Sequence, residues 1–306
     1  MISIVIPLYN KEKQIRTTLK SVLAQTFSDY ETIIVNDGST DRSAEEVTKV
    51  QDPRIRLIHQ ENAGVSAARN RGIEDARGEY IAFLDADDRW KPEYLQTQYE
   101  LTQLYPECSV FACNYEFVDA QGQVKPTIIR KLPFTIEHGV LNNYFEVASC
   151  SHPPICSISI MVRKDSILSI GGFPPGIKSG EDLLTWARLA CRYKIAFCKI
   201  SLAQFLYDKK HFNINQQERM PDKPDIVGKE LAQLARNNHK ISGIRRYISC
   251  WHKMRARIYL EKGIRWMSIK ECAYSLRWHI SIKVAVFFML NLMPKCLINT
   301  IMKKYS

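Results

Sequence analysis

The chain has 306 residues, of which 45% are apolar and 25% charged, as in a soluble globular protein with one large domain or one domain and an appendage. Its nine cysteines are scattered, odd in number and without a Cys-x-x-Cys pair, which argues against a disulfide framework or a structural zinc site and favours free thiols in a reducing cytosol. The net charge of +11 is concentrated in residues 225–306, where 16 Lys and Arg outnumber four Asp and Glu.

The first hundred residues alternate between short apolar runs and helical patterns. The apolar, β-branched runs that predict strands are residues 2–6, 32–35, 55–58 and 80–84. Helices are predicted over residues 15–23 and 67–76 and from Ser43, where the capping-box spacing to Glu46 opens one. This order indicates an α/β fold with a mostly parallel, Rossmann-like sheet and helices on both faces. No basic stretch precedes the first run, so it reads as a strand and not as a signal peptide.

The pattern becomes mixed after residue 92. It contains one further strand pattern at residues 157–162, a loop rich in glycine and proline at 171–176 and a helical pattern at 182–192. Residues 208–224 are polar and include two prolines, so we expect a linker within this stretch, followed by helices that are basic and aromatic.

Polar residues follow three of the predicted strands. They are residues 7–10 after the first strand, 36–41 after the second and 85–88 after the fourth. Open α/β sheets bind their ligands at the carboxyl ends of their strands. We therefore expect the three segments to converge on one cleft.

Asp85 and Asp87 are candidate metal ligands. Residues i and i+2 of an extended chain point the same way, so the two carboxylates can address one hard cation such as Mg²⁺ or Mn²⁺. That cation could bridge a diphosphate and neutralise its charge as it leaves. The alternative is that Asp87 or Asp88 caps a helix that opens near Pro92. A cap does not explain three carboxylates at one buried strand end, where like charges are costly without a counter-ion.

Residues 37–41 also have two interpretations. Alone, they read as a turn followed by a helix cap. In one cleft with Tyr9 and Asp85, however, Asp37 becomes a candidate acceptor for the N–H of a nucleotide base, and the ring of Tyr9 offers a surface against which that base could pack.

Four segments resemble the successive motifs of glycosyltransferase family 2, in the family's order and at its spacing. They are Ile4–Asn10 (IVIPLYN), Val35–Asp41 (VNDGSTD), Ala67–Asn70 (AARN) and Phe83–Asp88 (FLDADD). Gly171–Phe173 (GGF) and Gly180–Leu184 (GEDLL), with Arg188 beyond them, are similar to the later part of the family's pattern, which includes its Glu-Asp segment. The resemblance covers about residues 1–212. It implies the GT-A fold and a reaction that inverts the configuration of the transferred sugar.

The resemblance also implies roles for single residues. Asp182 matches the family's catalytic base; its alternative is an acidic helix N-terminus, where the dipole favours carboxylates. Asp87, helped by Asp85, would hold Mn²⁺ or Mg²⁺. The residues that would hold the donor nucleotide are Pro7, Tyr9, Asn10, Asp37, Arg69 and Asp85.

The family often carries a Tyr-Arg-x-His segment near the end of its catalytic domain. Residues 207–211 depart from it, because Asp208 replaces the Arg and His211 comes one residue late. His211 is then either a metal or phosphate ligand or a surface histidine.

We accordingly expect a catalytic domain over residues 1–215, with a nucleotide-binding half to about residue 100 and an acceptor half from about 101. A linker at 216–224 and a basic helical tail at 225–306 would follow.

The tail interleaves basic and aromatic residues with apolar stretches. Among them are Arg245, Arg246, Arg255, Arg257, Trp266, Arg277, Trp278 and Lys283. Helices of this kind suit an anionic membrane surface; the alternatives are nucleic acid and a merely solvated face. The most apolar stretch, residues 284–293, is too short to cross a bilayer. We expect peripheral association with the cytoplasmic face of the inner membrane and no nucleic-acid partner.

Together these features predict a metal-dependent inverting glycosyltransferase. The resemblance implies a UDP-sugar donor and a glycan or lipid-linked acceptor in bacterial surface polysaccharide assembly. One alternative is an inactive protein that binds sugar nucleotides or acts as a scaffold. A dehydrogenase is disfavoured, because residues 7–11 contain no glycine where a Gly-x-Gly-x-x-Gly turn is needed.

Overall fold

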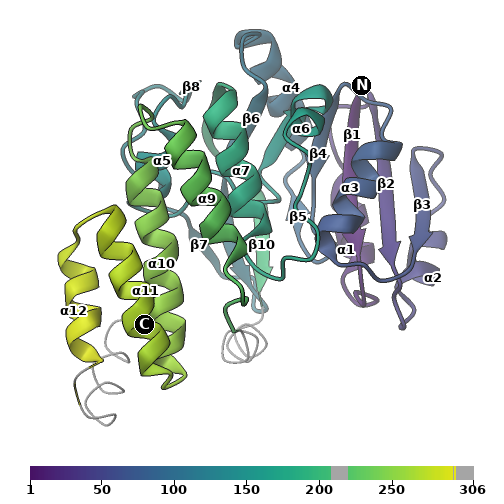
Figure 1. The fold of residues 1–306 in the computed structure, drawn as a ribbon. Helices are drawn as coiled ribbons and strands as arrows, with labels where there is room; N and C mark the ends of the chain where they lie inside the picture. The colour runs from purple at the N-terminus through teal and green to yellow at the C-terminus, as the bar shows by residue number, and fades with distance from the viewer. Residues whose placement is uncertain (208–219, 292, 294–306) are drawn as a thin grey trace. The chain divides into compact units, whose positions relative to one another are not determined.

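The computed structural model describes residues 1–207, 220–291 and 293 of the chain. The chain forms two compact units, an N-terminal unit (Met1–Phe212) and a C-terminal unit (Asn213–Ser306). Figure 1 shows a sheet flanked by helices in the first unit and a group of helices in the second.

The N-terminal unit contains ten strands in the described residues. They are β1 (Ile2–Leu8), β2 (Tyr30–Asp37), β3 (Ile55–Gln60), β4 (Tyr80–Phe83), β5 (Arg89–Trp90), β6 (Val110–Asp119), β7 (Val124–Pro126), β8 (His138–Val140), β9 (Ile160–Arg163) and β10 (Ile195–Tyr207). The helices of this unit are α1 (Ile15–Leu23), α2 (Ser43–Thr48), α3 (Val65–Asp75), α4 (Tyr94–Leu104), α5 (Tyr144–Ala148), α6 (Lys164–Ser169) and α7 (Glu181–Arg192).

All ten strands belong to one sheet. Its main order is β3-β2-β1-β4-β9-β6-β10-β5, with β7 added beside β6 and β8 beside β10. Strands β1 to β4 pair in parallel, whereas β9 runs antiparallel to both β4 and β6, and β5 runs antiparallel to β10. The predicted α/β fold with helices around a central sheet is confirmed, and its parallel part is the block formed by β1 to β4 together with the β6–β10 pair.

The alternation of side chains along β1 explains the layers on either side of the sheet. Ile4 and Ile6 are fully buried in one core cluster with Leu19 of α1, because every second residue of a strand faces the same side. On the opposite face, α3 packs so close that a Cβ on Gly72 would collide with the side chain of Val5. The resulting core fixes the carboxyl end of β1, where the first polar segment begins.

Two elements differ from the sequence-based expectation. The strand predicted from residue 157 begins at Ile160, so Ser157 lies in the preceding loop. The expected capping box at α2 is not formed, because Arg42 occupies the N-cap position and no side chain caps this helix. The hydroxyl of Ser43 accepts from the backbone N–H of Lys11 (2.6 Å), while the N–H of Ser43 donates to Asp41 (2.9 Å). The first serine of α2 therefore ties two loops together.

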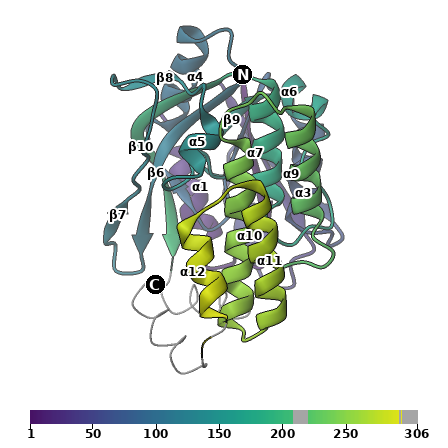
Figure 2. The same ribbon diagram turned by 60° about the vertical axis from the view of Figure 1, so that its left-hand side comes forward.

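The C-terminal unit is helical in its described part. Its helices are α9 (Ile226–Asn237), α10 (Ile244–Glu261), α11 (Arg265–Trp278) and α12 (Ile282–Leu290). Figure 2 shows α10, α11 and α12 side by side. Helices α10 and α11 are joined by buried Ser249 and Ser275, whose hydroxyls lie 2.8 Å apart. Across residues 1–207, 220–291 and 293, no helix combines the length and apolar character that a bilayer crossing requires. Eight cysteines among these residues are free thiols.

Candidate functional site

A pocket of about 370 Å³ lies at the carboxyl ends of β1, β2 and β4. It is lined by Pro7, Leu8, Tyr9, Lys11, Asp37, Asn62, Gly64, Val65, Ala68, Arg69, Asp85, Ala86 and Asp87. The predicted convergence of three strand ends is therefore present in the structure. Asn10 is not part of this lining; it lies nearby with φ of 52°, and its side-chain oxygen accepts from the N–H of Thr40 (2.8 Å).

Arg69 connects Asp85, after β4, with Glu181 at the start of α7. Its Nη2 lies 2.8 Å from Oδ1 of Asp85, and its Nη1 lies 3.5 Å from Oε1 of Glu181. Arg69 is only 3% exposed. Burial opposes its charge, but the two carboxylates outweigh that effect and raise its pKa. The second oxygen of Asp85 accepts from the hydroxyl of Ser157 (2.8 Å). Asp85 is thus held from two sides.

The other two carboxylates of the Asp85–Asp88 segment have different surroundings. Asp87 is partly exposed, and its Oδ2 lies 2.5 Å from Nζ of Lys11. Asp88 is buried and accepts from the backbone N–H of Leu206 in β10 (2.7 Å). Burial and the neighbouring charges of Asp87 and Asp85 raise the pKa of Asp88 well above its ordinary value. Neither aspartate caps a helix, because α4 begins at Tyr94 with Glu93 as its N-cap.

Glu181 and Asp182 form the first turn of α7, after Gly180 in the left-handed conformation (φ 87°). Burial and the adjacent charge of Asp182 raise the pKa of Glu181 to about 7, although Arg69 opposes this shift. The charge of Asp182 also acts on Arg69. One buried guanidinium therefore couples both acidic segments, which are far apart in the sequence.

Asp37 is 3% exposed and already accepts three hydrogen bonds. Its donors are the side chain of Gln60 (2.7 Å) and the backbone N–H groups of Ala63 and Gly64 (2.9 Å each). These bonds fix the loop that leads into α3, which agrees with the structural interpretation of this motif. Asp37 also lines the pocket, as does Tyr9, which is 48% exposed.

The acidic segment suits a hard divalent cation. Three carboxylates meet at one strand end, where burial first and the charges of Asp87 and Asp85 second raise the pKa of Asp88. The contact between the ammonium of Lys11 and Asp87 shows that a cation is favoured at this place. Asp87 and Asp85 present the oxygen ligands that Mg²⁺ and Mn²⁺ prefer.

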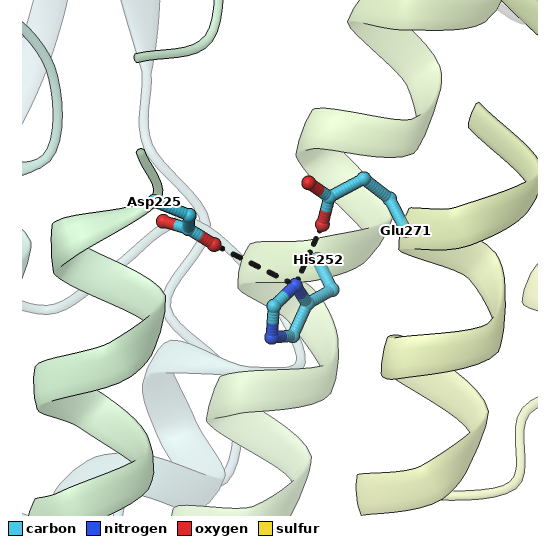
Figure 3. Close-up of side chains that lie close together, drawn as sticks. All are labelled: Asp225, His252 and Glu271. Carbon is cyan, nitrogen blue, oxygen red and sulfur yellow. Dashed lines mark hydrogen bonds and ion pairs between the residues drawn. The ribbon is translucent and has the colours of Figure 1, made fainter. Parts of the chain in front are cut away.

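A second group of metal-ligand types lies in the C-terminal unit, at Asp225, His252 and Glu271 (Figure 3). Nδ1 of His252 lies 2.7 Å from Glu271 and 3.9 Å from Asp225. The buried guanidinium of Arg255 already serves both carboxylates, with Nε 2.9 Å from Glu271 and 3.4 Å from Asp225. With Arg255 in place, this group is a buried hydrogen-bonded network that joins α9, α10 and α11.

The remaining candidates lie at the end of the first unit and in the tail. His211 falls outside the described residues. In the tail, Arg255 is buried and Arg257 pairs with Glu261 (2.7 Å), whereas Trp266 is 74% exposed.

Comparison with known proteins identifies the family. A family model described as Glycosyl transferase family 2 matches residues 3–158, just over half of the chain. The chain belongs to glycosyl transferase family 2. This family relationship confirms the resemblance seen in the sequence motifs.

Relatives and solved structures agree with this assignment. TuaG of Bacillus subtilis (strain 168), named as a teichuronic acid biosynthesis glycosyltransferase, is 30% identical over 192 residues, which are 62% of this chain and 71% of TuaG. Curated relatives that match at 45% to 48% identity are covered over only 34% to 35% of their own length.

Two solved structures share the fold. S. aureus TarS in complex with UDP-GlcNAc gives a TM-score of 0.65 at 17% identity, over 94% of this chain and 84% of TarS. The mannosyltransferase PcManGT from Pyrobaculum calidifontis, in complex with GDP-Man and Mn²⁺, gives a TM-score of 0.62 at 16% identity, over 94% of this chain and 78% of PcManGT. At these identities the similarity establishes the fold, which is the predicted GT-A fold.

Three contacts of the site were missed by sequence reasoning. Lys11 directly follows the first motif, so its position was a usable signal. Ser157 contacts Asp85 from a loop 72 residues away, and Glu181 contacts Arg69 from 112 residues away. No local pattern in the sequence indicates either of these two contacts.

Proposed function

We propose that this protein is an inverting, metal-dependent glycosyltransferase that moves a sugar from a nucleotide sugar to an acceptor hydroxyl. The observation that carries the proposal is the buried Arg69, which holds Asp85 and Glu181 together and so joins the acidic strand end to the turn that contains Asp182. An α/β sheet offers its ligands a site at this edge, and family membership gives the reaction class.

The pocket is the proposed donor site. Tyr9 offers an exposed ring for the base, and Asp37 belongs to the lining of the same pocket. Pro7 and Arg69 belong to the same lining. Asn10 lies outside it and braces the loop that follows β2, because its side-chain oxygen accepts from the N–H of Thr40. The complex of TarS with UDP-GlcNAc, on the same fold, supports a UDP-sugar as donor.

Asp87 and Asp85, which both line this pocket, would hold Mn²⁺ or Mg²⁺. A bound ion would neutralise the negative charge that develops on the departing nucleoside diphosphate. The complex of PcManGT with GDP-Man and Mn²⁺ supports a divalent ion in this fold. Lys11 contacts the same carboxylate of Asp87 and would compete with the ion for it.

Asp182 is the proposed general base. In a single displacement, its carboxylate accepts the proton of the acceptor hydroxyl as the oxygen attacks the anomeric carbon from the face opposite the diphosphate. Its place in the first turn of α7 favours an ionised carboxylate, because the helix dipole is positive there. Arg69 fixes the adjacent Glu181, which keeps the turn in register with the donor pocket.

We further propose that residues 1–215 form the catalytic domain, with a donor half to about residue 100, and that a linker at 216–224 leads to a membrane-associated tail. The basic charge of residues 225–306 supports this. So do the exposed apolar side chains of Ile280, Ile282 and Met289 beside or within α12. The protein would then act at the cytoplasmic face of the membrane on a glycan or lipid-linked acceptor. The name of TuaG supports a role in surface polysaccharide assembly.

The rival is an inactive protein that binds sugar nucleotides. A screen of nucleotide sugars for release of the nucleoside diphosphate, in Mn²⁺ and in EDTA, separates the two. We expect slow release with one donor class in Mn²⁺, little in EDTA, and none from Asp182→Asn above background. Tight donor binding without release by the wild-type protein would support the rival.

A further inference from the structure

A groove of about 590 Å³ lies among three helices of the C-terminal unit. Its lining comes from Asp225 at the N-cap of α9 and from side chains of α9, α10 and α11. Figure 1 shows these three helices next to one another.

We propose that this groove is a binding site for a phosphate or diphosphate group. Four basic side chains line it: Lys229, Arg236, Arg245 and Arg277. Within the described part of the chain, no ion pair joins any of the four to a carboxylate. Arg257 of α10, which is not part of the lining, does have such a partner in Glu261. The groove therefore collects positive charge that the protein itself leaves uncompensated, and an anion is the ligand it favours.

Asp225, the acidic member of the lining, does not cancel this charge. Its side chain accepts from the N–H of Gly228 (2.9 Å) and from Nε1 of Trp251 (3.1 Å), and Arg255 lies 3.4 Å away. Because Arg255 also pairs with Glu271 (2.9 Å), Asp225 keeps part of its charge, but as a single carboxylate it can offset only one of the four basic side chains of the lining. In Figure 3, Nε2 of His252 is turned away from both carboxylates.

The groove is also preorganised. The guanidinium of Arg245 lies over the ring of Trp278 at 5.8 Å, and its Nε donates to the carbonyl of Trp278 (3.3 Å). This packing reduces the freedom that a long side chain would lose on binding a ligand. Arginine forks match the geometry of phosphate oxygens, and Lys229 adds a point charge. Three arginines and a lysine in one groove suit a group of two or more negative charges.

The first test is calorimetry of the full-length protein with inorganic diphosphate in EDTA, which removes the divalent ion that the proposed donor site would use. The groove variant is Lys229→Gln/Arg277→Gln. The matched control is Lys240→Gln/Lys283→Gln, which removes the same charge from exposed positions outside the lining. We expect binding by the wild type, a loss of at least about tenfold in the groove variant and a change of less than about twofold in the control.

No binding by the wild type, or equal losses in both variants, would overturn the proposal. The groove variant should still release nucleoside diphosphate from its donor at the wild-type rate, so failure here is distinguishable from failure of the proposed transferase activity.

A competition experiment identifies the source of the phosphate. Phosphatidylcholine vesicles that carry phosphatidic acid should displace inorganic diphosphate if the natural ligand is a lipid headgroup, and phosphatidylcholine alone should not. If neither vesicle displaces it, the groove takes a soluble phosphate ester. If plain phosphatidylcholine displaces it equally well, apolar insertion and not phosphate recognition is responsible, and the proposal fails.

Discussion

Replacing Arg69 by methionine should lower the free energy of unfolding far more than the same replacement of a surface arginine on the same helix. The guanidinium of Arg69 is 3% exposed and lies 2.8 Å from Asp85 and 3.5 Å from Glu181. Removing one partner from a buried ion pair leaves an uncompensated buried charge, which costs roughly 3–5 kcal/mol. We expect the free energy of unfolding of Arg69→Met to fall by about that amount when Glu181 is ionised.

The loss should depend on pH in a defined direction. The pKa of Glu181 is raised to about 7, so at about pH 5.5 this carboxyl is largely protonated and only Asp85 remains as an ionised partner of Arg69. The destabilisation measured by urea unfolding should therefore be smaller at about pH 5.5 than at about pH 8. The double variant Arg69→Met/Glu181→Gln should recover part of the loss at the higher pH.

Arg71 is the matched control, because it lies on the same helix and pairs with Asp75 at the i,i+4 spacing on the surface. Arg71→Met should cost no more than about 0.5 kcal/mol. Losses of similar size for Arg69→Met and Arg71→Met, or a pH-independent loss for Arg69→Met, would refute the reasoning.

Three further predictions concern the acidic residues. Asp87→Asn should abolish the metal-dependent part of UDP binding, measured by calorimetry with and without Mn²⁺, and leave the unfolding midpoint nearly unchanged, because this side chain is partly exposed; unchanged affinity would remove Asp87 from the metal site. Asp182→Asn should keep donor binding and lower turnover roughly 10²–10⁴-fold; a loss below about tenfold would leave Glu181 as the next base to test. Glu181 has a folded-state pKa of about 7 against an ordinary value of 4.5, so its contribution to stability is present at low pH and is lost as the pH rises toward 7. Glu181→Gln should flatten the pH profile of the unfolding free energy between those values, and an unchanged profile would contradict the shift.

Much of the donor half could be predicted from the sequence because its signals are local. The apolar run from Ile2 predicts a buried strand, and the helical spacing of residues 15–23 predicts a helix with one buried face; the structure contains both. Once those elements form a parallel sheet, its topology places Tyr9, Asp37 and Asp87 at one edge without further information.

The second half of the sheet could not be predicted in the same way. Strand β10 is 13 residues long, but its register against β6 shifts between Cys198 and Ala203. This shift interrupts the regular alternation of side chains between the two faces of the sheet. Strand β9 is short and is placed between β4 and β6 by long-range pairing. Arg69 shows the same limit at the site: its helix was predicted, but its burial between two carboxylates depends on a partner 112 residues away.

The configuration of the first sugar released from the donor tests the central claim most directly, and it does so without an identified acceptor. The protein is incubated with an α-linked UDP-sugar and Mn²⁺, and the anomeric proton of the hydrolysed sugar is followed by NMR before mutarotation. Attack by water in place of the acceptor, from the face opposite the diphosphate, should give the β anomer first, with release suppressed by EDTA and by Asp182→Asn. Initial release of the α anomer, or release that is indifferent to both EDTA and Asp182→Asn, would contradict the proposed mechanism.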